Sequence, residues 1–298
     1  MKDFCGLVSI VGRPNVGKST LLNRLIEQKI SITSRKSQTT RNNILGIKTK
    51  ENHQMVFIDT PGVHINASKV MNKVLNQSAL GAIEDADLII FMLQRNKINT
   101  LDELILERLK EVNTKKICVI NKLDQVASIN SLLPVIEKLR SEHDFAEIIP
   151  VSAKTGKNIN ELENMICQNL PENNHLYDSD TKFLAKESFM ISEIIREKII
   201  RFLGEELPHE TYVQLQKLED KENIVNIDAE IIVARESQKG IVVGKNGAKL
   251  KKIGEKARID LEKFFNKKVF LKTWVKTKKN WNNDSDFISS LGIGSLYD

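Results

Sequence analysis

Short apolar runs alternate with stretches of helical period through the first half of the chain. The apolar runs predict buried strands, and the stretches between them, with apolar side chains three and four positions apart, predict amphipathic helices. The expected strands are residues 4–11, 44–50, 55–58, 88–93, 117–120 and 147–151, and the expected helices are residues 18–28, 69–84, 101–111 and 130–143. The first half is therefore a succession of strands and helices.

The pattern changes near Pro171. Residues 171–180 contain turn formers without apolar periodicity, which predicts a linker. The chain of 298 residues is about twice the length of a typical single domain. We therefore expect a first domain at 1–171, a linker at 172–182, a second domain at 183–279 and a tail at 280–298. In the second domain the pattern predicts a helix at 183–203 and strands at 212–218, 226–234 and 268–276.

A phosphate-binding motif follows the first expected strand directly. Residues 12–19 read G-x-x-x-x-G-K-S between a strand and a helix, which is where a P-loop must lie. Its glycines let successive backbone N–H groups point at phosphate oxygens, and the positive end of the helix adds to them. Lys18 is expected to reach the β- and γ-phosphates, and Ser19 to hold Mg²⁺. The nucleotide contacts expected here are Gly12, Arg13, Pro14, Asn15, Val16, Gly17, Lys18, Ser19 and Thr20.

Two further segments have the chemistry of a γ-phosphate site. The strand at 55–58 runs into Asp59, Thr60, Pro61 and Gly62. A carboxylate at the end of a strand can hold the metal through a water, while the Gly62 N–H can donate to the γ-phosphate. Residues 31–41 are polar, rich in hydroxyl groups and without periodicity, which indicates a loop that a ligand orders. A threonine of this loop can lend its hydroxyl to Mg²⁺.

A base-recognition motif ends the strand at 117–120. Residues 121–124 read N-K-x-D. Guanine presents N1–H and N2–H₂ side by side, so the Asp124 carboxylate can accept from both, whereas adenine lacks this pair of donors. Asn121 is expected to bond the base and to tie back to the P-loop. The contacts expected around the base are Asn121, Lys122, Leu123 and Asp124, with Ser152, Ala153 and Lys154 after the next strand.

These elements, in this order and rough spacing, resemble the Era family of bacterial GTPases, through G-R-P-N-V-G-K-S, Q-T-T-R, D-T-P-G, N-K-x-D and S-A-K. The resemblance implies an α/β P-loop G domain with a six-stranded, mostly parallel sheet and helices on both faces. It implies hydrolysis of GTP to GDP and phosphate with Mg²⁺ as cofactor. Lys18, Thr40 and Gly62 are the implied catalytic residues. Thr40 joins Ser19 and the water-linked Asp59 on Mg²⁺, with Thr39 as the alternative for that place.

One position departs from the small signalling G proteins. They carry a glutamine directly after D-x-x-G, whereas this chain has Val63, which also belongs to the expected nucleotide contacts and cannot hydrogen-bond an attacking water. Hydrolysis then rests on positioning and charge neutralisation, and slow intrinsic turnover is expected. Related families place K⁺ near the phosphates, so the resemblance implies K⁺ beside Asn15; shaping of the loop by Asn15 is the alternative. His64 is expected to be an exposed loop residue.

Charge is concentrated in one block of the second half. Residues 235–279 contain 15 basic and 4 acidic residues, a net charge of +11, whereas the whole chain carries +6. Inside this block, residues 242–253 read V-V-G-x-x-G-x-x-L-x-x-I, close to the signature of a KH domain, with a helix–turn–helix corner as the alternative. The glycines permit a tight turn that a nucleic-acid backbone can approach. The expected RNA contacts are Gly244, Lys245, Asn246, Gly247, Lys249, Lys251 and Lys252.

The order helix, strand, strand, helix, helix, strand after the linker matches a type II KH domain, and a G domain followed by this α+β module resembles Era over nearly the whole chain. The resemblance implies a monomeric, cytoplasmic GTP-hydrolysing switch that binds small-subunit rRNA near its 3′ end during assembly of the 30S subunit. The alternatives are an RNA-binding scaffold whose G domain binds GTP and GDP without turnover, and a GTPase of the tRNA-modification group. Peripheral association with the inner membrane is a further alternative, and Trp281 and Phe287 are candidate anchors for the tail.

Overall fold

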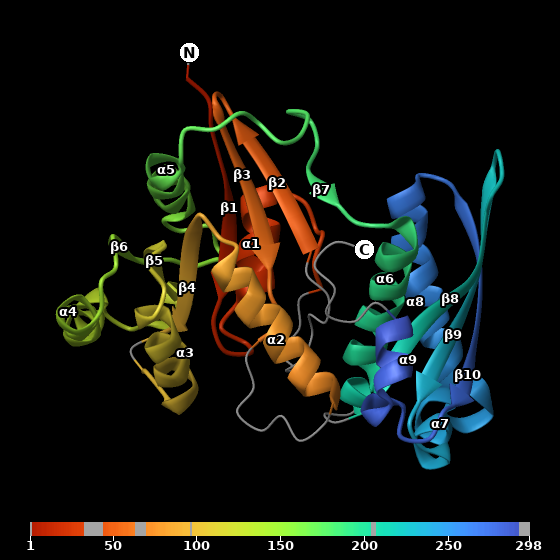
Figure 1. Cartoon of the computed structure of the whole chain (residues 1–298). Helices are drawn as coiled ribbons and strands as arrows, with labels where there is room; N and C mark the ends of the chain where they lie inside the picture. The colour runs from red at the N-terminus through yellow and green to blue at the C-terminus, as the bar shows by residue number, and fades with distance from the viewer. Residues whose placement is uncertain (1, 33–43, 63–69, 96, 204–206, 292–298) are drawn as a thin grey trace.

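The computed structural model describes residues 2–32, 44–62, 70–95, 97–203 and 207–291 (Figure 1). Their strands form two sheets, one in each domain. The first sheet contains β1 (Phe4–Val11), β2 (Ile44–Lys50), β3 (His53–Asp59), β4 (Leu88–Gln94), β5 (Lys115–Asn121), β6 (Glu147–Pro150) and β7 (Phe183–Leu184). Its strand order is β6-β5-β4-β1-β3-β2-β7. Among the described strands of this first sheet, only the pairings of β2 with β3 and β7 are antiparallel, so the sheet is mostly parallel, as predicted.

Helices cover both faces of this sheet. They are α1 (Lys18–Ile26), α2 (Val70–Glu84), α3 (Thr100–Lys110), α4 (Leu133–Glu142) and α5 (Ile159–Asn169). Side chains of α1 and α5 share one apolar core with Val8 and Ile10, and those of α2, α3 and α4 share the other with Ile89 and Phe91. Because the parallel strands end at one edge, β1, β3 and β5 deliver the residues after them to the same side of the domain.

Two expectations for this domain need correction. Six strands come from residues 1–171, but a seventh, β7, comes from Phe183 and Leu184, which were expected to begin a helix. The helix α6 (Glu187–Phe202) begins later, because the backbone of β7 pairs with Leu45 and Gly46 of β2 and Phe183 packs on the first core. The helix α5 was not among the expected elements.

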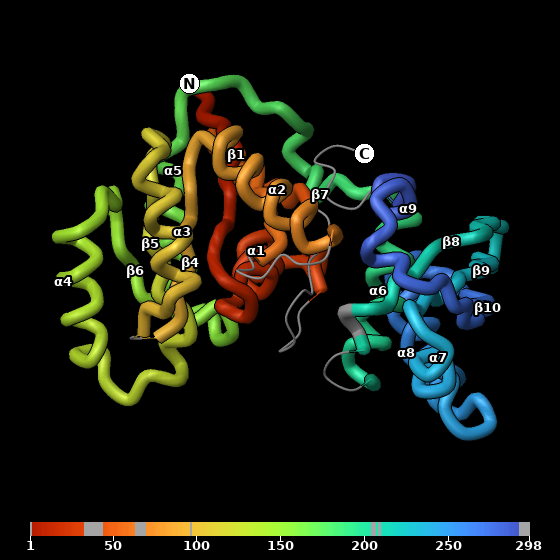
Figure 2. The backbone as a smooth tube through the Cα atoms, turned by 60° about the horizontal axis from the view of Figure 1, so that its bottom comes forward, coloured from red at the N-terminus to blue at the C-terminus, as the bar shows by residue number. Residues whose placement is uncertain are grey.

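The linker packs against the first domain through hydrogen bonds. The Gln54 side chain accepts hydrogen bonds from the backbone N–H groups of Leu176 (2.8 Å) and Tyr177 (3.0 Å) and donates one to the Tyr177 carbonyl (2.8 Å). The Ile47 N–H of β2 donates to the Lys182 carbonyl at 2.8 Å. Figure 2 follows this segment in green from α5 to β7. The second domain is therefore attached through an ordered segment.

The second domain has the predicted type II KH order. After α6 come β8 (Thr211–Asp220), β9 (Ile224–Val233), α7 (Glu236–Val243), α8 (Ala248–Phe265) and β10 (Lys268–Thr277). The sheet order is β10-β9-β8, with β9 parallel to β10 and antiparallel to β8. Apolar side chains of α6 and α8 pack against the strands, with Ile195, Ile199, Ile231, Ile253 and Leu261 fully buried.

The tail joins the two domains. The turn at Trp281–Asn283 and helix α9 (Ser285–Ser290) follow β10. Trp281 is 0% exposed and lies in an apolar cluster with Met71 and Leu75 of α2 and Ile232 of β9. The Trp281 indole donates to the Glu210 carbonyl at 3.0 Å, and Phe287 packs beside the cluster, so both aromatic residues are the anchors expected from the sequence. Within the part of the chain that the structure describes, no helix is long and apolar enough to cross a bilayer.

Candidate nucleotide site and nucleic-acid interface

The P-loop lies between β1 and α1, and the Asn121 side chain packs closely against its Gly17. Gly17 has φ of 110°, which L side chains rarely adopt, and a Cβ on it would lie 2.2 Å from the Asn121 Nδ2. Asn121 in turn donates to the Val16 carbonyl at 2.8 Å and accepts from the Ala153 N–H at 3.0 Å. Asn121 therefore joins the P-loop to the Ser152-Ala153-Lys154 segment, the tie expected of it.

The Lys18 ammonium group is held within the P-loop, where a phosphate is expected to bind. Its side chain is buried, and its ammonium donates to the carbonyls of Gly12 (2.9 Å) and Arg13 (3.3 Å). Burial lowers the pKa of Lys18 to about 8, and the nearby Asp59 carboxylate offsets part of that effect. A phosphate placed here would favour the charged lysine and raise its pKa again.

This shift predicts proton uptake on nucleotide binding. At about pH 8.5, most Lys18 side chains of the free protein are neutral, so binding of GDP is expected to take up about 0.7 proton per site on this account. The measurement is calorimetric titration in two buffers of different ionisation enthalpy. Lys18→Arg is the control, because its guanidinium stays charged at this pH; equal proton uptake by the two proteins would contradict the assignment.

The expected metal ligands that are described lie together. The Asp59 Oδ2 accepts from the Ser19 hydroxyl at 2.8 Å and from the Ser31 hydroxyl at 2.7 Å. Gly62 packs against the P-loop so closely that a Cβ on it would lie 2.8 Å from the Pro14 Cγ. Hydroxyl and carboxylate oxygens are the ligands Mg²⁺ prefers, so Ser19 and Asp59 fit this ion. Thr39, Thr40, Val63 and His64 lie outside the described residues.

A cavity of about 620 Å³ opens beside the P-loop. Its lining residues are Asn15, Gly17, Thr20, Arg95, Asn121, Lys122, Asp124, Gln125, Ala153 and Lys154. The Lys122 ammonium donates to the Asn15 carbonyl at 2.7 Å, which lays its stem along the cavity. The Asp124 Oδ1 accepts from the Ser152 hydroxyl at 2.6 Å. The structure thus brings the P-loop, N-K-x-D and Ser-Ala-Lys residues around one space, and Asp124 is among the residues that line it.

The side chains of some predicted contacts are engaged inside the protein. The Arg13 side chain is turned to α3, where it pairs with the buried Asp102 at 3.0 Å. Val16 and Leu123 are buried in the cores, and the Thr60 hydroxyl donates to the Ile10 carbonyl at 2.8 Å. These residues shape the site and leave their backbone groups for the ligand.

Two lining residues were missed in the sequence. Arg95 and Gln125 hydrogen-bond each other at the cavity. No motif names Arg95; the available signal was its place directly after the strand β4. Gln125 directly follows N-K-x-D, which was signal enough to include it.

The G-x-x-G segment forms a tight turn between α7 and α8. Gly244 has φ of 73°, and a Cβ on it would lie 2.7 Å from the Lys249 Cβ, so the close approach of the two helices requires glycine there. Asn246, with φ of 51°, adopts the left-handed conformation that asparagine tolerates. Lys245 and Asn246 are exposed at the tip. The turn therefore presents polar side chains and backbone on a convex point, as a KH loop requires.

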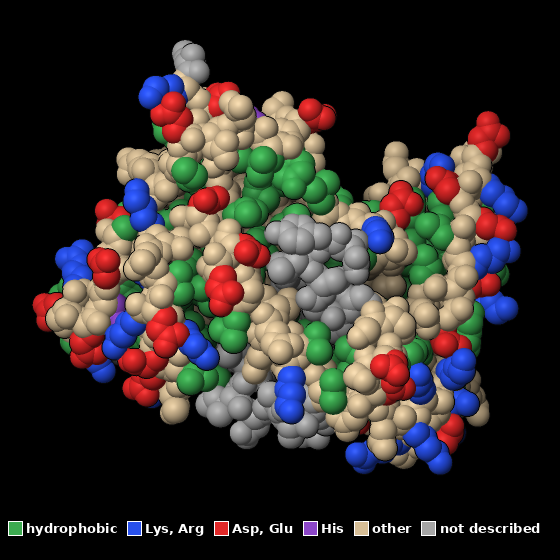
Figure 3. Space-filling model, viewed as in Figure 1, with side chains coloured by type: hydrophobic (Ala, Val, Ile, Leu, Met, Phe, Trp, Pro, Cys, Tyr) green, Lys and Arg blue, Asp and Glu red, His purple; other side chains and the backbone are tan. Residues whose placement is uncertain are grey.

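The predicted lysines line the start of α8. Lys251 and Lys252 are exposed and Lys249 is half-buried, and the Lys252 ammonium lies 5.2 Å from the centre of the Phe202 ring. Figure 3 shows basic side chains gathered around α7 and the adjoining part of the second domain. The structure places all the predicted RNA contacts on one turn and the helix that follows it.

Family models match both halves of the chain. The model described as 50S ribosome-binding GTPase matches residues 7–122, and the model described as KH domain matches residues 206–282. The prediction of a P-loop G domain followed by a KH domain is confirmed.

Curated relatives match nearly the whole chain. GTPase Era of Coxiella burnetii (strain Dugway 5J108-111) is 46% identical over 290 residues, which cover 97% of this chain and 98% of the relative. GTPase Era of Haemophilus influenzae (strain PittGG) is 46% identical over 292 residues, covering 98% and 97%.

Solved structures agree with these relatives. Era in complex with MgGDPNP and nucleotides 1506-1542 of 16S ribosomal RNA superposes with a TM-score of 0.94 at 37% identity, covering 97% of this chain and 99% of that one. A variant of Aquifex aeolicus Era bound to GDP.AlF4- gives a TM-score of 0.93 at 37% identity, covering 98% and 99%. The chain therefore belongs to the Era family of GTPases.

Proposed function

We propose that this protein is a GTP-hydrolysing switch that binds small-subunit rRNA near its 3′ end and acts in assembly of the 30S subunit. One observation carries the proposal: a cavity lined by P-loop residues and Asp124 and an exposed G-x-x-G turn lie in one chain. The relative solved with MgGDPNP and a 16S ribosomal RNA segment supports the choice of both ligands. The working units are residues 1–171 and 183–279, the protein acts as a monomer, and its place of action is the cytoplasm.

The site residues have two roles in hydrolysis: some bind the guanine base and others neutralise phosphate charge. Asp124, with Asn121 and Lys122, selects and holds guanine, and Lys18 with the P-loop amides neutralises phosphate charge. Ser19, Thr40 and a water on Asp59 would hold Mg²⁺, which would supply further positive charge at the phosphates. The Gly62 N–H positions the γ-phosphate. Val63, directly after D-x-x-G, cannot hydrogen-bond an attacking water, so we expect slow turnover without a partner.

The test is phosphate release at multiple turnover, with and without an RNA that spans the 3′ end of 16S rRNA. We expect slow turnover that releases more than one mole of phosphate per mole of protein. We also expect the RNA affinity to differ between the protein bound to a GTP analogue and the protein bound to GDP. Release of no phosphate beyond background would instead support the scaffold alternative. Equal RNA affinity in both nucleotide states would be consistent with RNA binding but would contradict the proposal that the nucleotide controls it.

Potassium is part of the proposed site. Asn15 lines the cavity beside the P-loop, where its side chain can share a K⁺ ion with phosphate oxygens. Turnover in potassium chloride is expected to exceed turnover in sodium chloride about tenfold at equal ionic strength, because the proposed site binds K⁺ in preference to the smaller Na⁺ and only bound K⁺ then neutralises phosphate charge. Asn15→Ala should remove the difference, and the exposed Asn130→Ala should keep it. Equal rates in the two salts would exclude the ion.

A further inference from the structure

A short turn behind the metal site is fixed by one side chain. The Asn23 Oδ1 of α1 accepts from the N–H groups of Ile30 (2.8 Å) and Ser31 (2.9 Å), and its Nδ2 donates to the Ser31 carbonyl at 2.8 Å. The buried Ser31 hydroxyl then donates to the Asp59 Oδ2 at 2.7 Å. Asp59 is thus oriented from two sides, by Ser19 of the P-loop and by Ser31 of this turn.

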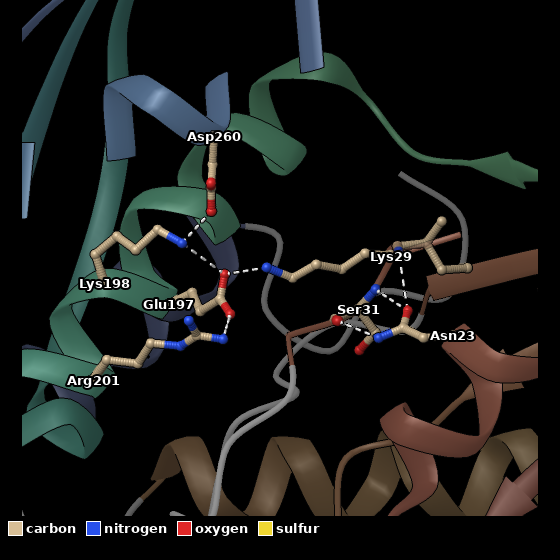
Figure 4. A network of polar contacts seen from close by, with 8 residues as sticks. Asn23, Lys29, Ser31, Glu197, Lys198, Arg201 and Asp260 are labelled. Atoms are coloured by element: carbon tan, nitrogen blue, oxygen red, sulfur yellow. Dashed lines mark hydrogen bonds and ion pairs between the residues drawn. The ribbon is translucent and has the colours of Figure 1, made fainter. Parts of the chain in front are cut away.

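The residue before this turn reaches into the second domain. The Lys29 ammonium lies 2.6 Å from the Glu197 Oε2 of α6, and Figure 4 shows the Lys29 side chain extended across the space between the domains. Glu197 is 1% exposed and also pairs with Lys198 at 3.2 Å and Arg201 at 2.5 Å. Lys198 bonds Asp260 of α8 as well. A single network therefore runs from Asp59 to the helix that begins at the G-x-x-G turn.

The buried Glu197 carboxylate is held in place by its charged partners. A carboxylate withdrawn from water must be compensated by charged partners, and Lys198 and Arg201 supply this from its own helix. Lys29 adds a partner from the other domain, and its side chain stays 51% exposed. Loss of Lys29 leaves Glu197 compensated within α6, so the second domain keeps its fold and only the ion pair between Lys29 and Glu197 is lost.

We propose that Glu197 is a positioning residue for the Mg²⁺ site of the other domain. By fixing Lys29 it fixes the turn at 29–31, and through that turn it sets where the Ser31 hydroxyl holds Asp59. The inference rests on the proposed role of Asp59 in the nucleotide site. The same contacts connect α8 to Asp59. A change in the position of α8 can therefore change the position of Asp59, which couples the nucleic-acid interface to the metal site.

The experiment measures the dissociation rate of a fluorescent GDP from the full-length protein as a function of Mg²⁺ concentration. The Mg²⁺ midpoint is the concentration at which Mg²⁺ has half of its full effect on this rate. Lys29→Met and Ser31→Ala are each expected to raise the Mg²⁺ midpoint about fivefold, the size expected when one typical hydrogen bond that orients Asp59 is weakened or lost. The double variant should raise it no more than the larger single change, because both substitutions break the same connection. Ser31→Thr, which keeps the hydroxyl, should restore the midpoint.

Lys50→Met is the matched control. Lys50 is also a part-exposed lysine, 41% exposed, and pairs at 3.2 Å with the buried Glu163 inside the first domain. Its replacement removes the same kind of pair and should leave the Mg²⁺ midpoint unchanged. Melting temperatures of all variants would report any general loss of folding.

Two outcomes separate this inference from the function on which it rests. If Asp59→Asn leaves the Mg²⁺ midpoint at its original value, the assignment of the metal site itself fails. If Asp59→Asn shifts the midpoint while Lys29→Met does not, or if Lys29→Met and Ser31→Ala shift it additively, the positioning role of Glu197 is overturned and the metal site stands.

Discussion

Asp124→Asn is expected to lower GTP affinity about a hundredfold and to raise the affinity for xanthosine triphosphate. The Ser152 hydroxyl donates to one Asp124 oxygen at 2.6 Å, so the asparagine carbonyl will take this bond. The new NH₂ group then faces the guanine donors, and two donors oppose each other. Xanthine has a carbonyl in place of the 2-amino group and accepts from the new amide. Titration with fluorescent nucleotides measures both affinities.

Asp178→Asn is the control for this change. It makes the same substitution at an exposed position of the linker, remote from the cavity lining, and should leave both affinities unchanged. Unaltered GTP affinity of the Asp124 variant would show that guanine is selected elsewhere.

Lys245→Asp combined with Asn246→Asp should reduce RNA affinity by about two orders of magnitude at moderate salt, because negative charge then lies where phosphate must approach. Both side chains are exposed at the tip of the turn, and Gly244 and Gly247 keep its backbone conformation. Folding and RNA-independent GTP turnover should therefore stay near their original values. Filter binding with single-stranded RNA measures the loss.

A double variant of equal charge change tests whether the loss is local. Lys138→Asp with Asn130→Asp alters two exposed residues around α4 of the first domain by the same charge. It should weaken RNA binding slightly through long-range repulsion alone. Similar losses in the two double variants would mean that general charge, and not the G-x-x-G turn, governs binding.

The nucleotide site could be predicted from the sequence because its chemistry is local. Apart from Q-T-T-R, each of its motifs lies at or just after the end of a strand, and parallel strands deliver such residues to one edge whatever the details of packing. The same holds for the G-x-x-G turn, where Gly244 is required by a helix five residues away in sequence. Helix α5 also had a local signal, the apolar spacing of Ile159, Leu162 and Ile166, that was available in the sequence.

The remaining features depend on contacts between distant segments. Phe183 and Leu184 suit a helix or a strand equally, and the free edge of β2 decides between them. The pairing of Lys29 with Glu197 joins residues 168 positions apart, and nothing near either residue indicates the other. Arg13 illustrates the same limit, since only the fold shows that the buried Asp102, and not phosphate, takes its side chain.

The pairing of β7 with β2 also protects the chain from self-association. Without Phe183 and Leu184, the hydrogen-bonding groups of Leu45 and Gly46 on β2 would face solvent at the border of the sheet. An uncovered border strand recruits strands from other molecules, and β2 is apolar over its first residues. A chain shortened to residues 1–171 would keep every residue that lines the nucleotide cavity and yet expose this border strand, so the first sheet depends on two residues from beyond 1–171 to cover its edge.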